Sequence, residues 1–296
     1  MTQSDSHPSG SAVTAGVDLG GTTVSVGLAA GFDSRVYTAQ VGAARSADEV
    51  ADIITGLVRE AAAGFDLGAV GVGVPVPAGP KTDILGHCPN LPIIEGVPFR
   101  TMLEERLGVP VVLENDARCM VFGEYRAGAL RGHETCACIT LGTGLGLGSV
   151  VDGRILRGAF LAAGEIWHVP AREGVMLEDQ ASARGLRALA AGLTDDIREL
   201  FELWQTGDER ARNVFGGYGR VIGQVACMVA AVLDPGAIAV GGGISRAADA
   251  FFPAVKRYMD DVLTPPWEGQ LVRAELSDRA AVIGAAELAA DRIARR

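Results

Sequence analysis

The sequence predicts an α/β fold in which one strand–turn–strand unit occurs twice. Segments rich in β-branched residues alternate with segments of helical periodicity, as in folds where helices cover a mixed sheet. Two glycine-rich segments, residues 16–26 and 139–150, share the same order of strand, glycine turn and strand. We therefore expect a duplicated α/β domain with a cleft between the two copies.

The first half of the chain contains clear start and stop signals. Ser46 and Glu49 form a capping-box pattern at the start of a helix. A buried strand stops at Pro75, which has no N–H to donate. The expected elements are a hairpin at residues 16–26, a helix at 46–63, a strand at 69–75, a helix near 99–108, a strand at 109–116 and a helix at 117–130.

The second half repeats this order. Residues 135–156 predict a strand, a glycine turn, a strand and a third strand beyond the "DG" turn. Helical patterns extend from about residue 179 to 233, and "AIAV" at 237–240 predicts another strand. The glycines of "GGGI" follow it directly, before further helices.

Composition and charge exclude several classes of protein. A net charge of −10 disfavours nucleic acid and anionic membranes as partners. The five cysteines include no CxxC pair and lie in apolar segments, which favours a reducing cytosol. The longest apolar run is too short to cross a bilayer, and the polar residues 1–14 predict a disordered tail. We expect a cytoplasmic protein.

The glycine turns are candidate phosphate-binding sites. "GTGLGLG" at residues 142–148 precedes a strand rather than a helix, which disfavours a dinucleotide fingerprint, and no GxxxxGK[ST] occurs. A hairpin with Asp18 at its entrance and Thr22 in its turn instead suits amides and hydroxyls that hold phosphates, with a carboxylate for Mg²⁺. A plain β-hairpin remains the alternative for either turn alone.

Two further segments carry charged residues. "VVLENDA" ends a strand with Asn115 and Asp116, either as a helix cap or as a proton acceptor at a ligand site. "GEIWHVPAREGVMLED", residues 164–179, brings Glu165, His168 and Glu178 together. These three side chains would suit a metal, acid–base chemistry or the binding of hydroxyl groups.

Seven motifs together resemble the ROK family of sugar kinases, in the hexokinase–actin superfamily. They are "GVDLGGTT", "PNLP", "ENDA", "LGTGLGLG", "GEIWH", "MLEDQASARGL" and "LDPGAIAVGGGIS", in family order over about residues 15–290. The resemblance implies duplicated actin/hexokinase-like (ribonuclease H-like) α/β domains that flank a central cleft. It implies a smaller N-terminal domain at 15–117, which also receives the C-terminal helix at about 281–296, and a larger domain at 118–280.

The resemblance also assigns roles to residues. Asp116 resembles the catalytic base, and Asp18 the carboxylate that holds Mg²⁺ through water. The implied sugar ligands are Asn90, Asn115, Asp116, Glu165, His168 and Glu178. The implied ATP- and phosphate-binding residues are Asp18, Gly20, Gly21, Thr22, Gly142, Thr143, Gly144, Gly241, Gly242 and Gly243.

The chain departs from the family pattern in two ways. Typical members hold a structural Zn²⁺ with the histidine and three cysteines, but "VPAREGVM" after His168 has no cysteine, so we predict no zinc. We expect packing of Trp167, Val169 and Met176 to hold this loop instead. Trp167, Arg118 and Val76 replace family residues near the sugar, and we expect them to change its selection or the activity.

The predicted function is the ATP- and Mg²⁺-dependent phosphorylation of a hexose or hexose derivative. The partners are then a small sugar and a nucleotide, and the resemblance implies a homodimer. A polyphosphate donor is an alternative, which the lack of an obvious basic track disfavours. Two rivals of a different class are a non-catalytic sugar sensor, which would not need Asp116, and an actin-like ATPase, which would not need Glu165, His168 and Glu178.

Overall fold

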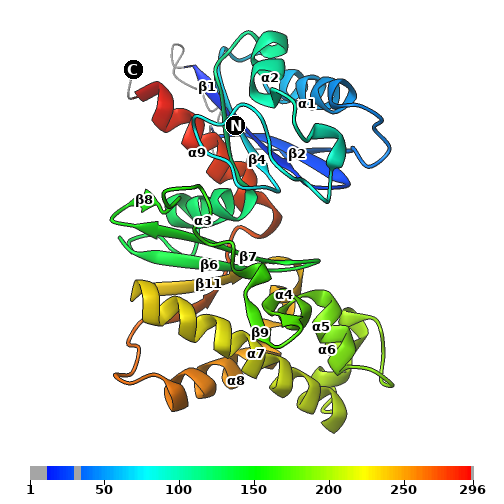
Figure 1. Ribbon diagram of the computed structural model, residues 1–296, viewed down its shortest axis with the longest axis vertical. Coiled ribbons are helices and arrows are strands. Elements are labelled where there is room, and N and C mark those ends of the chain that lie inside the picture. Colours follow the sequence, from blue (N-terminus) through cyan, green and yellow to red (C-terminus); the bar gives the residue numbers. More distant parts are fainter. Residues whose placement is uncertain (1–11, 30–34, 295–296) are drawn as a thin grey trace, which may run out of the picture. The chain divides into compact units, whose positions relative to one another are not determined.

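The computed structural model describes residues 12–29 and 35–294, which fold into two compact units (Figure 1). The N-terminal unit comprises Met1–Asp116 and Ala285–Arg296, and the C-terminal unit comprises Ala117–Gly284. Each unit contains a five-stranded mixed sheet with helices on both faces.

The sheet of the N-terminal unit has the order β3-β2-β1-β4-β5. The strands β3, β2 and β1 are antiparallel, and β4 and β5 extend the sheet parallel to β1. The glycine turn at residues 20–22 joins β1 to β2, as expected. The strands are β1 (Val13–Leu19), β2 (Thr23–Leu28), β3 (Tyr37–Gln40), β4 (Leu67–Val74) and β5 (Val111–Asn115).

Alternation along β4 decides which helices cover which face of this sheet. Val70 and Val72 belong to the core that includes α1 (Ala47–Ala61) and α2 (Phe99–Leu107). Gly71 points to the opposite face, where a Cβ would lie 1.8 Å from the Ala285 carbonyl oxygen of α9 (Ala280–Ala294). The C-terminal helix therefore packs directly on the sheet backbone at a position that only glycine fits.

The capping box is formed on one side only. The Ser46 hydroxyl accepts a hydrogen bond from the Glu49 N–H at 3.2 Å, as expected for an N-cap. The Glu49 carboxylate accepts from the Arg45 N–H at 2.8 Å. The predicted return bond to the Ser46 N–H is thus replaced by one to the preceding residue.

The sheet of the C-terminal unit repeats the first, with the order β12-β11-β6-β7-β8. Read from β8, it again has three antiparallel strands followed by two that run parallel to the first strand of the hairpin. The predicted duplication and the third strand beyond "DG" are therefore confirmed. The strands are β6 (Cys136–Leu141), β7 (Leu145–Val151), β8 (Arg154–Ile155), β11 (Ala237–Gly241) and β12 (Gln270–Arg273).

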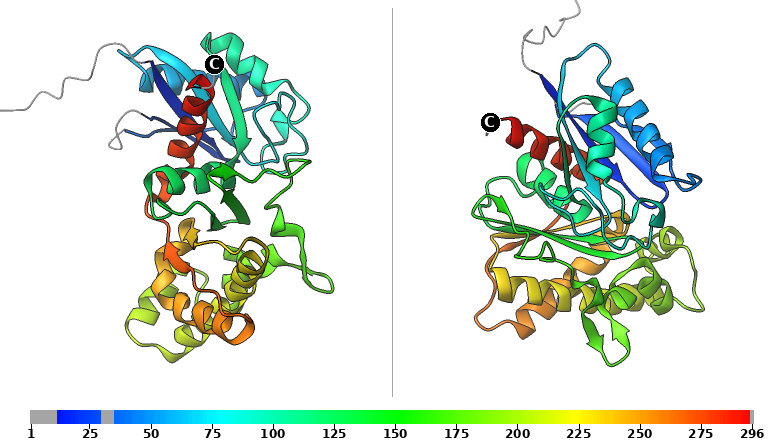
Figure 2. Two further views of the ribbon diagram at one scale, coloured as in Figure 1. Left: turned by 90° about the vertical axis from the view of Figure 1, so that its left-hand side faces the viewer. Right: turned by 45° about the horizontal axis from the view of Figure 1, so that its top comes forward.

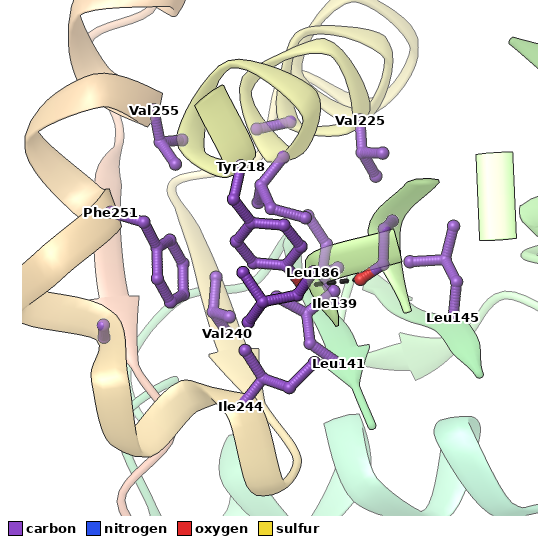
Figure 3. Close-up of a cluster of buried hydrophobic side chains, with 14 of the residues drawn as sticks. Ile139, Leu141, Leu145, Leu186, Tyr218, Val225, Val240, Ile244, Phe251 and Val255 are labelled. Atoms are coloured by element: carbon purple, nitrogen blue, oxygen red, sulfur yellow. Dashed lines mark hydrogen bonds between the residues drawn. The ribbon is translucent and has the colours of Figure 1, made fainter. Parts of the chain in front are cut away.

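Helices cover both faces of this second sheet. A Cβ on Gly148 of β7 would lie 2.3 Å from the Ala117 carbonyl oxygen, so α3 (Asp116–Ala127) packs closely on one face. Leu145 and Leu147 point the other way, into the core beneath α7 (Glu209–Leu233) and α8 (Ala248–Val262). Figure 3 shows this core, in which the Tyr218 hydroxyl of α7 donates to the Ala181 carbonyl oxygen at 2.5 Å.

The helical region that we expected from about residue 179 to 233 is divided among the four helices α4 to α7. The remaining short elements of the chain are η1 (Pro92–Ile94), η2 (Ile166–His168), β9 (Pro170–Arg172), β10 (Val175–Met176), α4 (Leu177–Ala181), α5 (Ala183–Leu189), α6 (Ile197–Gln205), η3 (Gly243–Ala247) and η4 (Ser277–Arg279).

The predicted N-terminal tail is too long. Residues 1–11 lie outside the described residues, but Val13 and Thr14 belong to β1 and pair with Leu67 and Ala69 of β4. The alternating apolar pattern of β1 starts earlier than the polar composition of residues 1–14 indicates.

Within the described part of the chain, α7 is the one helix long and apolar enough, by length and composition, to cross a membrane. Half of its most apolar stretch is buried inside the protein. Core helices of soluble proteins pass the same test, so this feature is weak evidence for a membrane span.

Candidate active site

The first glycine turn has a fixed backbone. The Gly20 N–H donates to the Thr23 carbonyl oxygen at 2.9 Å, which closes the turn. The Thr22 carbonyl oxygen accepts from the Val41 N–H at 2.8 Å, which ties the turn to the chain after β3. Backbone amides held in this way suit the binding of phosphate oxygens, because no ordering is needed when the ligand arrives.

Asp18 and Asp116 lie at the same edge of the N-terminal sheet. Asp18, half-buried in β1, pairs with Gly73 of the parallel strand β4. Gly73 also pairs with Glu114 of β5, two residues before Asp116. Since the three strands are parallel, both carboxylates lie where the carboxyl ends of these strands meet, which is where ligands bind in open α/β sheets.

Asn90 contacts the tip of the first glycine turn. A Cβ on Gly21 would lie 2.6 Å from the Asn90 carbonyl oxygen, so glycine is required for this contact. Asn90 itself is exposed. A predicted sugar ligand and a predicted phosphate-binding residue are thus in contact within the N-terminal unit.

The buried residue Cys88 lies two residues before Asn90 and feels the charge of Asp116. Burial raises the pKa of the Cys88 thiol, a hydrogen bond from the Leu91 N–H opposes this shift, and the negative charges of Glu95 and Asp116 add to it. The Asp116 carboxylate is therefore close enough to this loop for its charge to act on Cys88.

Asn115 supports Asp116. The Asn115 side chain is 7% exposed, and its Nδ2 donates to Asp116 Oδ1 at 3.0 Å. The same nitrogen lies 3.4 Å from the Val76 carbonyl oxygen. Asp116 is the first residue of α3, where a carboxylate also interacts favourably with the helix dipole. The geometry thus adds an orienting role for Asn115 that the sequence did not indicate.

Val76 does not present its side chain to a ligand site. Its side chain is 4% exposed and packs in the hydrophobic core of the N-terminal unit. We expected this substitution to change the selection of the sugar or the activity. From this core position Val76 reaches the site through its backbone, since its carbonyl oxygen lies 3.4 Å from Asn115 Nδ2.

The second glycine turn joins β6 to β7 and is bound to the helices that follow it. The Gly142 N–H donates to the Gly144 carbonyl oxygen at 3.1 Å, and the Gly142 carbonyl oxygen accepts from the Ala183 N–H at 2.8 Å. Thr143 at the tip is exposed. The turn therefore combines a fixed backbone with an accessible hydroxyl.

Glu178 contacts this turn directly. Its Oε2 accepts a hydrogen bond from the Leu145 N–H at 3.0 Å. A Cβ on Gly144 would lie 2.6 Å from the same oxygen. The sequence predicted Glu178 as a sugar ligand, and its carboxylate is also a structural partner of the predicted phosphate turn.

The third glycine cluster lies beside the second turn. Gly241 pairs with Thr140 of β6, and Gly242 has a positive φ of 79°. A Cβ on Gly242 would lie 2.4 Å from the Leu141 carbonyl oxygen. The Ser245 hydroxyl donates to the Gly242 carbonyl oxygen at 2.7 Å and fixes the backbone before α8. The residues Gly142–Gly144 and Gly241–Gly243 are therefore neighbours in the C-terminal unit.

Glu165 and His168 flank Trp167 at the short helix η2. The Trp167 indole N–H donates to Glu165 Oε2 at 2.8 Å. The Trp167 and His168 rings meet edge to face, with centroids 4.7 Å apart. Since η2 contacts α4, which contains Glu178, the three predicted sugar ligands of this unit lie in adjoining elements.

Arg118 holds the loop that leads to Glu165. Its side chain is fully buried, and Nη2 donates to the carbonyl oxygens of Leu161 at 2.6 Å and Ala163 at 3.0 Å. Leu161 has a positive φ of 60°, a conformation that a non-glycine residue adopts only when its surroundings fix it. The sequence marked Arg118 only as a departure from the family pattern, and did not indicate this role.

The segment after His168, which lacks the zinc-binding cysteines of typical family members, forms a β-hairpin. The strands β9 and β10 pair around Glu173 and Gly174, and the Leu177 N–H closes the segment on the Val169 carbonyl oxygen at 2.9 Å. The hairpin stands out from the C-terminal unit (Figure 2). Among the described residues, no group of three or more His, Cys, Asp or Glu side chains is arranged to hold a metal.

Side-chain packing does not hold this hairpin as we expected. Trp167, Val169 and Met176 are 44%, 38% and 40% exposed. Backbone pairing holds the segment instead, because two short strands with a glycine turn satisfy each other's N–H and C=O groups.

Comparison with known proteins places this geometry in a class. A model of the ROK family matches residues 14–292. The glucokinase of Streptomyces coelicolor is 30% identical over 309 residues, covering 94% of this chain and 97% of that enzyme. The ROK hexokinase from Thermus thermophilus has a TM-score of 0.81 at 30% identity, covering 96% of this chain and 100% of the other. A Streptomyces griseus ROK family glucokinase in complex with glucose and AMPPNP has a TM-score of 0.79 at 31% identity, covering 94% and 99%.

The duplicated sheets are those of the actin-like sugar kinase fold, and these relatives support a sugar kinase. Within that class, the chain belongs to the ROK family. The resemblance and the fold class predicted from the motifs are confirmed. The roles of single residues remain predictions.

Proposed function

We propose that this protein uses ATP and Mg²⁺ to phosphorylate a hexose or hexose derivative at a hydroxyl group. The observation that carries the proposal is the position of Asp116 at the carboxyl end of β5, with Asn115 hydrogen-bonded to one of its oxygens. Relatives named glucokinase and hexokinase support a hexose as acceptor, and the relative bound to AMPPNP supports ATP as donor.

In the proposed reaction, Asp116 accepts the proton of the sugar hydroxyl. The hydroxyl oxygen forms a bond to the γ-phosphorus while the bond from that phosphorus to the bridging oxygen of ADP breaks. Asn115 holds Oδ1 of Asp116, so that the carboxylate keeps one orientation. The amides of Gly21, Thr22, Thr143 and Gly144 are the proposed donors to the phosphates, because the Gly20 and Gly142 N–H groups close the two turns themselves.

The residues present fit a magnesium ion. Mg²⁺ keeps several waters and is usually bound by one or two carboxylates together with substrate phosphates. Asp18, half-buried beside the first glycine turn, supplies such a carboxylate. When bound, the ion would neutralise charge on the phosphates, and Asp18 would hold it through water.

Glu165, His168 and Glu178, together with Asn90 and Asn115, are the proposed sugar ligands. Carboxylates accept hydrogen bonds from hydroxyl groups, and an amide or imidazole can donate or accept, so this set suits a polyhydroxylated ring. Glu178 would then join two functions, because the same carboxylate also supports the second glycine turn.

The proposal is tested by incubating the protein with ATP, Mg²⁺ and single sugars, with glucose first and mannose, fructose, allose and N-acetylated amino sugars after it. Sugar-dependent release of ADP is the expected result. Asp116→Asn should lower kcat by at least about a hundredfold, the usual size of a general-base contribution, and should leave sugar binding measurable by calorimetry.

Release of ADP at equal rates from wild type and Asp116→Asn would reject Asp116 as the base. Activity with polyphosphate but not with ATP would show that polyphosphate, rather than ATP, is the phosphoryl donor. Sugar binding without turnover with either donor would make the protein a sensor and overturn the proposed activity.

We also propose that the protein is a cytoplasmic homodimer. Within each chain, the N-terminal and C-terminal units would act as the smaller and larger domains of the kinase. The support is the family membership. Light scattering coupled to size exclusion would measure twice the mass of the 30.6 kDa chain if the dimer forms.

A further inference from the structure

Trp167 is placed between two of the proposed sugar ligands and touches both. Its indole N–H donates to Glu165 Oε2 at 2.8 Å, within the range of a strong N–H···O bond. Its ring meets the edge of the His168 ring at a centroid distance of 4.7 Å and an interplanar angle of 70°. At 44% exposure, the side chain is not part of the hydrophobic core.

The backbone of Glu165 is fixed independently of Trp167. Gly164 has a positive φ of 92°, and a Cβ there would lie 2.2 Å from the Leu147 carbonyl oxygen. The Glu165 N–H donates to the Ala162 carbonyl oxygen at 3.2 Å, and Arg118 holds the carbonyl oxygen of Ala163. These contacts set the position of the Glu165 Cα but leave the carboxylate to its own rotamers.

The indole N–H of Trp167 fixes the orientation of the Glu165 carboxylate, which the backbone contacts leave open. An ionised carboxylate accepts hydrogen bonds at about four lone-pair sites, so a bond to Oε2 leaves capacity for substrate hydroxyls. An indole N–H is a donor only, and a donor to a charged acceptor makes a stronger bond than a neutral pair. A carboxylate fixed before the ligand arrives loses less side-chain entropy on binding.

We propose that Trp167 is a positioning residue, which orients the Glu165 carboxylate through its indole N–H and thereby sets the affinity for the sugar. The inference rests on the proposed function of Glu165 as a sugar ligand. It assigns to Trp167 a role in binding that is separate from the chemical step at Asp116.

The test uses the variant Trp167→Phe, which removes the N–H and keeps an aromatic ring beside His168. The KM and the calorimetric Kd for the sugar accepted by the wild type should rise about threefold to tenfold, because the Glu165 side chain would then be ordered only when the sugar binds. The kcat should change by no more than about twofold, because an interaction made equally in ground and transition states affects KM alone.

Trp267→Phe is a matched control. The Trp267 indole N–H also makes a 2.8 Å bond in the C-terminal unit, but to the Pro235 carbonyl oxygen. This variant should lower Tm and leave the sugar KM unchanged. An equal rise in KM for both variants, or no rise for Trp167→Phe, would overturn the inference.

A double-mutant cycle tests whether Trp167 acts through Glu165. In a Glu165→Ala background, Trp167→Phe should cause no further loss of sugar affinity. A further loss of about threefold to tenfold would show that the indole contacts the sugar itself and would overturn the positioning role. If the wild type turns over no sugar but binds glucose in calorimetry, the proposed kinase activity fails while this cycle still decides the inference through Kd. If it binds no sugar, both fail.

Discussion

The carboxylate of Glu178 and the backbone N–H of Leu145 are joined by a hydrogen bond of 3.0 Å across 33 residues of sequence. The bond connects the start of α4, which belongs to the proposed sugar site, to the end of the proposed phosphate turn. The Glu178 side chain therefore connects the proposed sugar site to the proposed phosphate turn, so that a change in one can disturb the other.

Two substitutions of Glu178 separate its two roles. Glu178→Gln keeps an oxygen that can accept from Leu145, so we expect the free energy of unfolding to change by no more than about 0.5 kcal/mol. The sugar KM should rise, because the charged acceptor for sugar hydroxyls is lost. Glu178→Ala removes the acceptor and should also lower the free energy of unfolding by about 1–3 kcal/mol, because the Leu145 N–H loses its partner. Chemical denaturation and sugar titrations of both variants measure the difference. Equal stability of the two variants would contradict the structural role.

The two glycines of the second turn should respond differently to an added methyl group. In Gly144→Ala the new Cβ would lie 2.6 Å from Glu178 Oε2 and displace the carboxylate from Leu145. We expect a loss of about 1–2 kcal/mol in unfolding free energy. Gly142→Ala is the control, since no described residue other than its chain neighbours has an atom within 4 Å of the Cβ that this substitution adds. Thermal unfolding compares the two, and similar Tm values would show that the Glu178 contact is not tight.

The crossing of α3 and α9 within the C-terminal unit depends on Gly284. A Cβ there would lie 1.8 Å from the Cys119 carbonyl oxygen, so Gly284→Ala must separate the helices and should cost about 3 kcal/mol or more. Gly216→Ala lies in α7, where the added Cβ would meet no atom within 4 Å from the described residues outside its own helical turn. This variant should instead stabilise by about 0.5–1 kcal/mol. Urea unfolding measures both, and a neutral Gly284→Ala would refute the close packing.

Alkaline pH should destabilise the protein through buried thiols. Burial raises the pKa of Cys136 from 9.0 to about 12. Below about pH 9 the thiol is protonated in both states; above it the unfolded state loses the proton first, so stability falls as pH rises toward 12. The slope from this group is about 1.4 kcal/mol per pH unit. The Cys136→Ala variant should show a shallower slope between pH 9 and 11 in denaturant titrations, and an unchanged slope would contradict the shift.

Local patterns determined much of the fold. The alternation of apolar residues and the glycines at 20, 21, 142 and 144 predicted both hairpins, because strand pairing with a glycine turn depends on neighbours in sequence. The same reasoning was wrong at residues 13–14, where polar composition suggested a tail, and at Glu49, whose side chain bonds Arg45 rather than Ser46.

The contacts that organise the site could not be predicted from such patterns. Arg118 reaches the carbonyl oxygens of Leu161 and Ala163, more than 40 residues away, and its burial depends on how α3 packs on the second sheet. Val76 was expected at the sugar, but the direction of its side chain is fixed by the core.

The sequence by itself determined the duplicated α/β plan, the family and the candidate ligands, because these depend on residue types in a fixed order. Only the tertiary structure decided which atoms those residues engage. Glu178 bonds Leu145 because the fold brings a donor and an acceptor that are 33 residues apart in sequence to 3.0 Å from each other. Side-chain direction is set by packing, which no single segment contains.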